Sequence, residues 1–82
     1  MIRAKAHLFE WPLPGAGALC VGALTAKDAP RTRGFEGEGY YLFVARRGGA
    51  PVEVMAKFVS EDAARAMRDS LRAALTRIQY VA

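Results

Sequence analysis

The sequence predicts one α+β domain over residues 1–82, in which a four-stranded antiparallel sheet (a meander) carries a C-terminal amphipathic helix on one face. Three observations support this fold class. The first segment of the chain alternates between apolar and polar residues, with the period of two that half-buried strands show. A Gly-Gly pair at residues 48–49 separates two strand-like runs, which is typical of a β-hairpin. The last quarter has its apolar residues at the three-and-four spacing of one helical face.

Four segments have the composition of strands. Residues 40–46 are the clearest, because tyrosine, leucine, phenylalanine and valine follow one another without a polar break. Such a run suggests a central strand that is covered on both faces. Pro12 and Pro14 predict a turn after the first strand, since two prolines cannot continue a ladder. The predicted strands are residues 2–9, 18–25, 40–46 and 51–59.

The predicted helix follows directly after the fourth strand, over residues 60–79. Ser60 is a suitable N-cap, and Glu61 and Asp62 suit the positive end of the helix dipole. Between the second and third strands, residues 27–39 are rich in glycine and charge, which predicts a long, exposed and mobile loop. The apolar stripe of the helix consists of Ala63, Ala64, Met67, Leu71, Ala74, Leu75 and Ile78.

The inventory of reactive side chains is small. Cys20 is the single cysteine and His7 the single histidine, so the sequence offers neither an intrachain disulfide nor a Cys/His zinc site. We expect Cys20 to be buried as a small hydrophobic residue. Glu36 and Glu38 alone are too few ligands to indicate a cation site. The sequence therefore predicts a protein that is not an enzyme and that has no metal and no cofactor.

Composition and charge narrow the class of protein. A hydrophobic share of 52% with 24% charged residues is typical of a folded chain. No run is long enough to span a membrane, and Glu10, Pro12 and Pro14 interrupt the apolar core that a secretion signal needs. We therefore expect a cytoplasmic protein without a membrane partner. The formal charge of +4 favours attraction to polyanions without specifying one.

One helix can cover one face of the predicted sheet, so the second face must meet water, a ligand or another subunit. If alternation holds, the helix side carries Ile2, Ala4, Ala6, Leu8, Val52, Val54, Ala56 and Phe58. The other side, which we call the open face, then mixes cations with large apolar groups. It carries Arg3, Lys5, His7, Phe9, Glu53, Met55 and Lys57, joined by Tyr41 and Phe43 or by Tyr40, Leu42 and Val44 according to the register.

The open face supports functions of different classes. The leading hypothesis is a small homodimeric binding or accessory module. A second subunit would supply the buried area that so short a chain lacks. The open face and residues 27–39 would then bind a partner. The alternative is a single-stranded nucleic-acid-binding protein, in which rings stack on bases and cations contact phosphates. A small-molecule pocket near Trp11 is a third hypothesis. The residues assigned to nucleic-acid or partner binding are Arg3, Lys5, Phe9, Tyr41, Phe43 and Lys57.

Overall fold

The computed structural model describes residues 7–15, 17–46 and 48–81. The predicted first strand is therefore described only from His7 onward, and Arg3 and Lys5 lie outside the described residues. In chain order the elements are β1 (His7–Leu13), β2 (Gly17–Leu24), the 3-10 helix η2 (Ala26–Arg31), β3 (Thr32–Arg33), β4 (Gly39–Arg46), β5 (Val52–Phe58) and α1 (Glu61–Val81).

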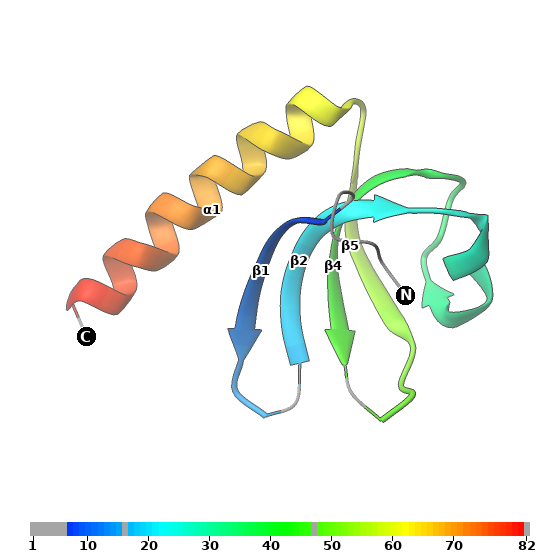
Figure 1. The fold of residues 1–82 in the computed structure, drawn as a ribbon, viewed down its shortest axis with the longest axis horizontal. Coiled ribbons are helices and arrows are strands. Elements are labelled where there is room, and N and C mark those ends of the chain that lie inside the picture. The colour runs from blue at the N-terminus through cyan, green and yellow to red at the C-terminus, as the bar shows by residue number, and fades with distance from the viewer. Residues whose placement is uncertain (1–6, 16, 47, 82) are drawn as a thin grey trace.

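The sheet has five strands in the order β1-β2-β4-β5-β3, with α1 at the opposite end of the molecule from η2 and β3 (Figure 1). The α+β class with one C-terminal helix is confirmed. The prediction of four antiparallel strands is wrong in one respect. The pairs from β1 to β5 are antiparallel, but β3 pairs parallel to β5 and makes the sheet mixed. This extra strand has two residues and belongs to the segment that the sequence predicts as a loop.

The first described strand extends further along the chain than alternation predicts. β1 ends at Leu13 and contains Pro12, which lies opposite Ala18 of β2, and the turn occupies residues 14–15. β1 is at the edge of the sheet, where the missing N–H of a proline can face away from the ladder. The prediction that Pro12 lies in the turn is therefore wrong, because an edge strand tolerates a residue that a central strand would exclude.

A bulge in β1 changes which of its side chains share a face. His7 lies opposite Gly22 and Phe9 opposite Val21, which leaves Leu8 as an extra residue between consecutive partners. An extra residue reverses the alternation beyond it. His7 and Phe9 consequently lie on opposite faces, whereas the sequence predicts them on the same face.

A second bulge divides β5 in the same way. Leu42 pairs with Ala56 and Phe43 with Val54, so Met55 is the extra residue. Val52 and Val54 pack against the cluster that contains Phe43, while Phe58 packs against the cluster under the helix. The predicted single face of alternating β5 residues is therefore wrong, because the bulge turns the two halves of the strand in opposite directions.

The helix covers one face of the sheet. The N-terminus of α1 is capped as predicted, since the Ala63 N–H donates to the Ser60 Oγ at 3.1 Å. Ala64 is fully buried against the sheet. The cluster on this face has buried Phe9, Val21 and Ala64 at its centre, surrounded by Leu8, Trp11, Tyr40, Leu42, Phe58, Met67, Leu71 and Leu75.

The second face is covered as well, by the segment between β2 and β4. Tyr41 and Phe43 are fully buried on this side, and Phe35 from the covering segment stacks on Tyr41 with ring centroids 6.0 Å apart. The Tyr41 hydroxyl accepts from the Glu36 N–H at 2.9 Å and donates to the Gly37 carbonyl at 2.6 Å. The sequence predicts a long exposed loop here. Most residues of this segment are exposed as predicted, but it contains η2 and β3 and is hydrogen-bonded onto the sheet.

We expect Tyr41→Phe to lower the free energy of unfolding by about 1–2 kcal/mol, because it leaves the two backbone groups without their buried partner. The matched control is Tyr40→Phe, which removes a hydroxyl from the neighbouring residue on the helix face. Urea unfolding measures both variants, and amide exchange at Glu36 should accelerate only in Tyr41→Phe. Equal losses in the two variants would contradict the role given to the Tyr41 hydroxyl.

Candidate functional site

The three aromatic residues assigned to binding are all buried. Phe9 is 7% exposed, and Tyr41 and Phe43 are 0% exposed. Stacking on a base requires an accessible ring face. The prediction that these rings lie on an open face is therefore wrong. Phe9 is turned towards the helix by the bulge in β1, and residues 26–38 cover the other two rings.

Lys57 is the described cation among the residues assigned to binding. Its side chain is exposed, but its Nζ donates to the Glu36 carbonyl and lies 5.6 Å from the centroid of the Tyr41 ring. A cation over a ring face is attracted by the ring quadrupole. Lys57 thus helps to hold residues 34–38 on the sheet. The structure does not bring the predicted set together as one accessible surface.

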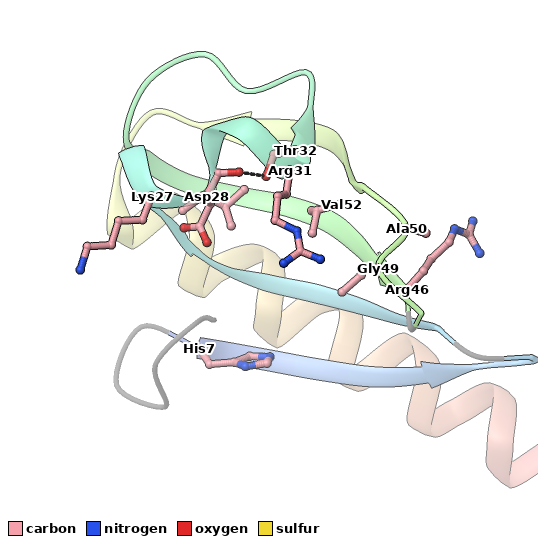
Figure 2. A pocket seen from close by; sticks show the side chains of 11 residues that line it. His7, Lys27, Asp28, Arg31, Thr32, Arg46, Gly49, Ala50 and Val52 are labelled. Atoms are coloured by element: carbon pink, nitrogen blue, oxygen red, sulfur yellow. Dashed lines mark hydrogen bonds between the residues drawn. The ribbon is translucent and has the colours of Figure 1, made fainter.

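A different place in the fold brings several cations around one pocket. A pocket of about 380 Å³ lies between η2, the turn that joins β4 to β5, and the first residue of β1 (Figure 2). We call it the η2 pocket. Its apolar wall consists of Leu24, Ala45 and Val52. Its charged and titratable residues are His7, Lys27, Asp28, Arg31 and Arg46.

Arg31 is the central cation of the η2 pocket. Figure 2 shows its side chain extending from η2 into the pocket. The guanidinium reaches the far wall, because its Nη2 lies 3.9 Å from where a Cβ on Gly49 would be. Gly49 has φ +80°, a backbone angle that favours glycine and forms the tight turn of this wall. Within the described ranges, Arg31 has no ion pair and donates no side-chain hydrogen bond.

Two further cations stand at the ends of the pocket. Lys27 and Arg46 extend outward on opposite sides of Arg31 in Figure 2. Arg46 is 4.0 Å from Glu53, with about half of each side chain exposed, so this ion pair contributes little. Both side chains are long enough to turn towards a molecule in the pocket.

The carboxylate of Asp28 is already engaged in starting η2. Its Oδ2 accepts from the Thr25 N–H at 2.7 Å and from the Thr25 hydroxyl at 3.3 Å. The Thr32 hydroxyl donates to the Asp28 carbonyl at 2.6 Å and closes the other end of η2. Farther along, the Ala26 N–H donates to Glu38 at 2.9 Å. These bonds fix the segment that carries Lys27 and Arg31.

His7 contributes an unsatisfied polar atom at the side of the pocket formed by β1. Its Nε2 is buried and has no hydrogen-bond partner, and across the described chain it is the one side-chain nitrogen or oxygen in that condition. The nearest carboxylate, that of Glu10, is 3.6 Å away. Buried polar atoms are usually hydrogen-bonded, so the His7 Nε2 atom is an exception in this part of the fold.

The described residues do not form a metal site or an activated nucleophile. No group of three His, Cys, Asp or Glu side chains in residues 7–15, 17–46 and 48–81 is placed to hold an ion. Cys20 is 2% exposed, as predicted for a small buried residue. Burial, with a smaller contribution from the charge of Glu10, raises the pKa of the Cys20 thiol to about 11. In the part of the chain that the structure describes, no helix is long and apolar enough to cross a membrane.

Sequence reasoning missed Lys27, Arg31 and Arg46 as a group. They come from two segments that the sequence places in a loop and at a hairpin, and only the fold of η2 onto the sheet brings them around one pocket. The available signal was local: each segment pairs arginines with a turn-forming Pro30 or Gly48. Such a signal indicates exposed cations near turns, but not that the two turns lie side by side.

We expect Cys20 to react with Ellman's reagent at pH 8 at least about a hundredfold more slowly in the folded chain than in urea. The raised pKa lowers the thiolate fraction by about that factor, and burial adds a barrier to access. The rate in the folded chain should rise with pH towards 11, because deprotonation occurs there. Equal rates in the folded and unfolded chains would show that the thiol is neither buried nor protonated as described.

No protein-family model, no curated protein and no solved structure matches this chain.

Proposed function

We propose that this chain is a small non-enzymatic binding module that holds an anionic partner in the η2 pocket. The observation that carries the proposal is the Arg31 guanidinium, which lies inside the pocket without a carboxylate partner in the described structure. An arginine fork is suited to carboxylate and phosphate oxygens, which it can bind through two parallel hydrogen bonds. Lys27 and Arg46 add positive charge at the two ends.

The charge of the whole chain supports the same partner chemistry. A formal charge of +4 attracts anions over longer distances, and the concave pocket concentrates the local field. The segment of η2 belongs to the residues 27–39 that the sequence assigns to partner binding. The proposal therefore keeps this segment as the binding surface and replaces the sheet face with the pocket beside it.

Binding, rather than catalysis, is the activity that the described groups support. The Cys20 thiol is protonated at neutral pH and its Sγ is hydrogen-bonded to the Ala18 carbonyl at 3.8 Å. His7 has Glu10 near it, but no hydroxyl or thiol is hydrogen-bonded to it within the described residues. A nucleophile needs a base within hydrogen-bond reach, which this arrangement does not provide.

Self-association is a second part of the proposal, and α1 supports it. The C-terminal end of α1 lies away from the strands in Figure 1. Leu71 and Leu75 of its apolar stripe are only half-buried, although they face the sheet cluster. A second copy packed along this stripe would bury them and would add the area that a small domain lacks.

We expect light scattering at tens of micromolar to give a mass about twice 8.9 kDa. Leu75→Glu should shift this mass to that of one chain, because a carboxylate cannot be buried in an apolar helix contact without a partner. The control is Thr76→Glu, at the next residue, which is exposed. Circular dichroism checks that both variants are folded. A wild-type mass of one chain would overturn the dimer.

We expect anionic probes to shift the amide resonances of Thr32, Gly49 and Ala50 in a saturable way at low salt. The probes are a single-stranded oligonucleotide, a poly-glutamate peptide and inorganic phosphate. Arg31→Gln should weaken the strongest probe about tenfold, since one charge-assisted contact is worth about 1.5 kcal/mol. Arg33→Gln, which removes the same charge two residues away and outside the pocket, should change the affinity less than about twofold.

Either of two results would overturn the anion-binding proposal. It fails if none of the probes shifts these amides, or if Arg31→Gln and Arg33→Gln weaken binding by the same factor. The second result would show attraction to the overall charge of the chain and no site at the η2 pocket.

A further inference from the structure

We infer that the ligand of the η2 pocket is a small molecule that carries a phosphate group, with a phosphate monoester as the best fit. This inference rests on the proposed function and names the ligand class for the same site. It follows from three properties of the pocket: its size, its charge and the division between its charged and apolar walls.

The size of the pocket suits a small molecule. A volume of about 380 Å³ is within the range of small-molecule sites, which are usually roughly 300–1,000 Å³. The pocket is bounded by η2 on one side and by the turn at Gly49 on the other, and Arg31 spans the gap between them. A nucleic-acid strand is instead followed by a long groove with aromatic platforms for its bases. The three rings that the sequence assigned to stacking, Phe9, Tyr41 and Phe43, are buried.

The charge of the pocket suits a dianion. Among the residues that line the pocket, Lys27, Arg31 and Arg46 exceed the one carboxylate, that of Asp28, by two positive charges. Glu53, outside the lining, forms an exposed pair with Arg46 at 4.0 Å and offsets little of this excess. The Asp28 Oδ2 is held by the Thr25 amide and hydroxyl, so it is not a partner for Arg31 within the pocket. A phosphate monoester carries about −1.5 to −2 at pH 7 and presents three acceptor oxygens. A single carboxylate would neutralise half of the excess.

The two kinds of wall match the two parts of a phosphate ester. Arg31 can bind two phosphate oxygens with its fork, and Lys27 and Arg46 can reach the same group from either end. The apolar wall of Leu24, Ala45 and Val52 then faces the organic part of the ester. Free phosphate shares the charged contacts but leaves this apolar wall uncovered.

The experiment is a set of NMR titrations at 150 mM NaCl, a salt concentration that screens non-specific attraction. The probes are phenyl phosphate, benzoate, inorganic phosphate and a single-stranded oligonucleotide. We expect phenyl phosphate to saturate the shifts of Thr32, Gly49 and Ala50 with a dissociation constant of about 1 mM or tighter. Benzoate should bind at least about tenfold more weakly, because it has one charge and two acceptor oxygens.

Three variants distinguish the contribution of the guanidinium geometry of Arg31 from that of its positive charge. Arg31→Lys keeps the charge and loses the fork, so it should weaken phenyl phosphate about tenfold while changing the oligonucleotide little. Arg31→Gln should remove the saturable shifts. Arg33→Gln is the matched control and should leave phenyl phosphate binding within about twofold of the wild type. Arg31 and Arg33 are both exposed, so we expect their variants to fold. The amide spectrum of each variant is compared with that of the wild type first to check this.

The outcomes distinguish this inference from the proposal on which it rests. Benzoate binding as tightly as phenyl phosphate, or pocket shifts with the oligonucleotide alone, would overturn the phosphate-ester ligand and leave an anionic partner in place. Absence of saturable shifts with all four probes would overturn both. Inorganic phosphate binding as tightly as phenyl phosphate would support the phosphate contacts and identify free phosphate as the source. Tighter binding of phenyl phosphate would identify the ester.

Discussion

The contact between the Tyr41 hydroxyl and the backbone of residues 36–37 is the interaction on which the second half of the architecture depends. One hydroxyl satisfies an N–H and a carbonyl of a segment that has no place in the main sheet ladder. It does so from β4, so the covering segment is tied to the middle strand of the sheet. Phe35 and Lys57 add a ring contact and a cation over the same tyrosine. One helix is therefore sufficient for a sheet with two apolar faces, because residues 26–38 cover the second face.

The η2 pocket results from the way in which residues 26–38 cover the sheet. Because residues 26–38 lie across β4 and β5, η2 is carried to the side of the β4–β5 turn, and a space remains between them. The bonds of Asp28 and Glu38 make the ends of this segment rigid. Arg31 is therefore presented from a fixed turn rather than from a free loop. Preorganisation of this kind reduces the entropy that a ligand contact must overcome.

The local sequence pattern was sufficient to predict the elements whose structure does not depend on residues distant in the chain. The Tyr and Phe run of β4, the Gly48–Gly49 turn and the cap at Ser60 each follow from a few neighbouring residues, and the structure contains all three. The faces of β1 and β5 could not be predicted in this way. A bulge at Leu8 or Met55 is a property of the pairing with the next strand, so alternation within one strand does not predict it.

The site was less predictable than the fold for a related reason. Tyr41 is buried beneath a covering segment whose composition is that of a loop. A hydrogen bond from Ala26 to Glu38, twelve residues apart, joins the two ends of this segment. Glycine and charge predict exposure when each residue is considered alone. Gly34 and Gly37 instead permit the positive φ angles with which the segment turns back onto the sheet. Arg31 gains its position only after that turn is made.

The extra residue in β5 makes the wall of the η2 pocket depend on the length of the strand as well as on its composition. Val52 and Val54 face the covering segment because Met55 separates their register from that of Ala56 and Phe58. A chain shortened by one residue at this point would present the opposite set of side chains, even if every remaining residue were unchanged. Among chains that share this architecture, a one-residue gap at the bulge would therefore separate those that keep the valine wall from those that lose it.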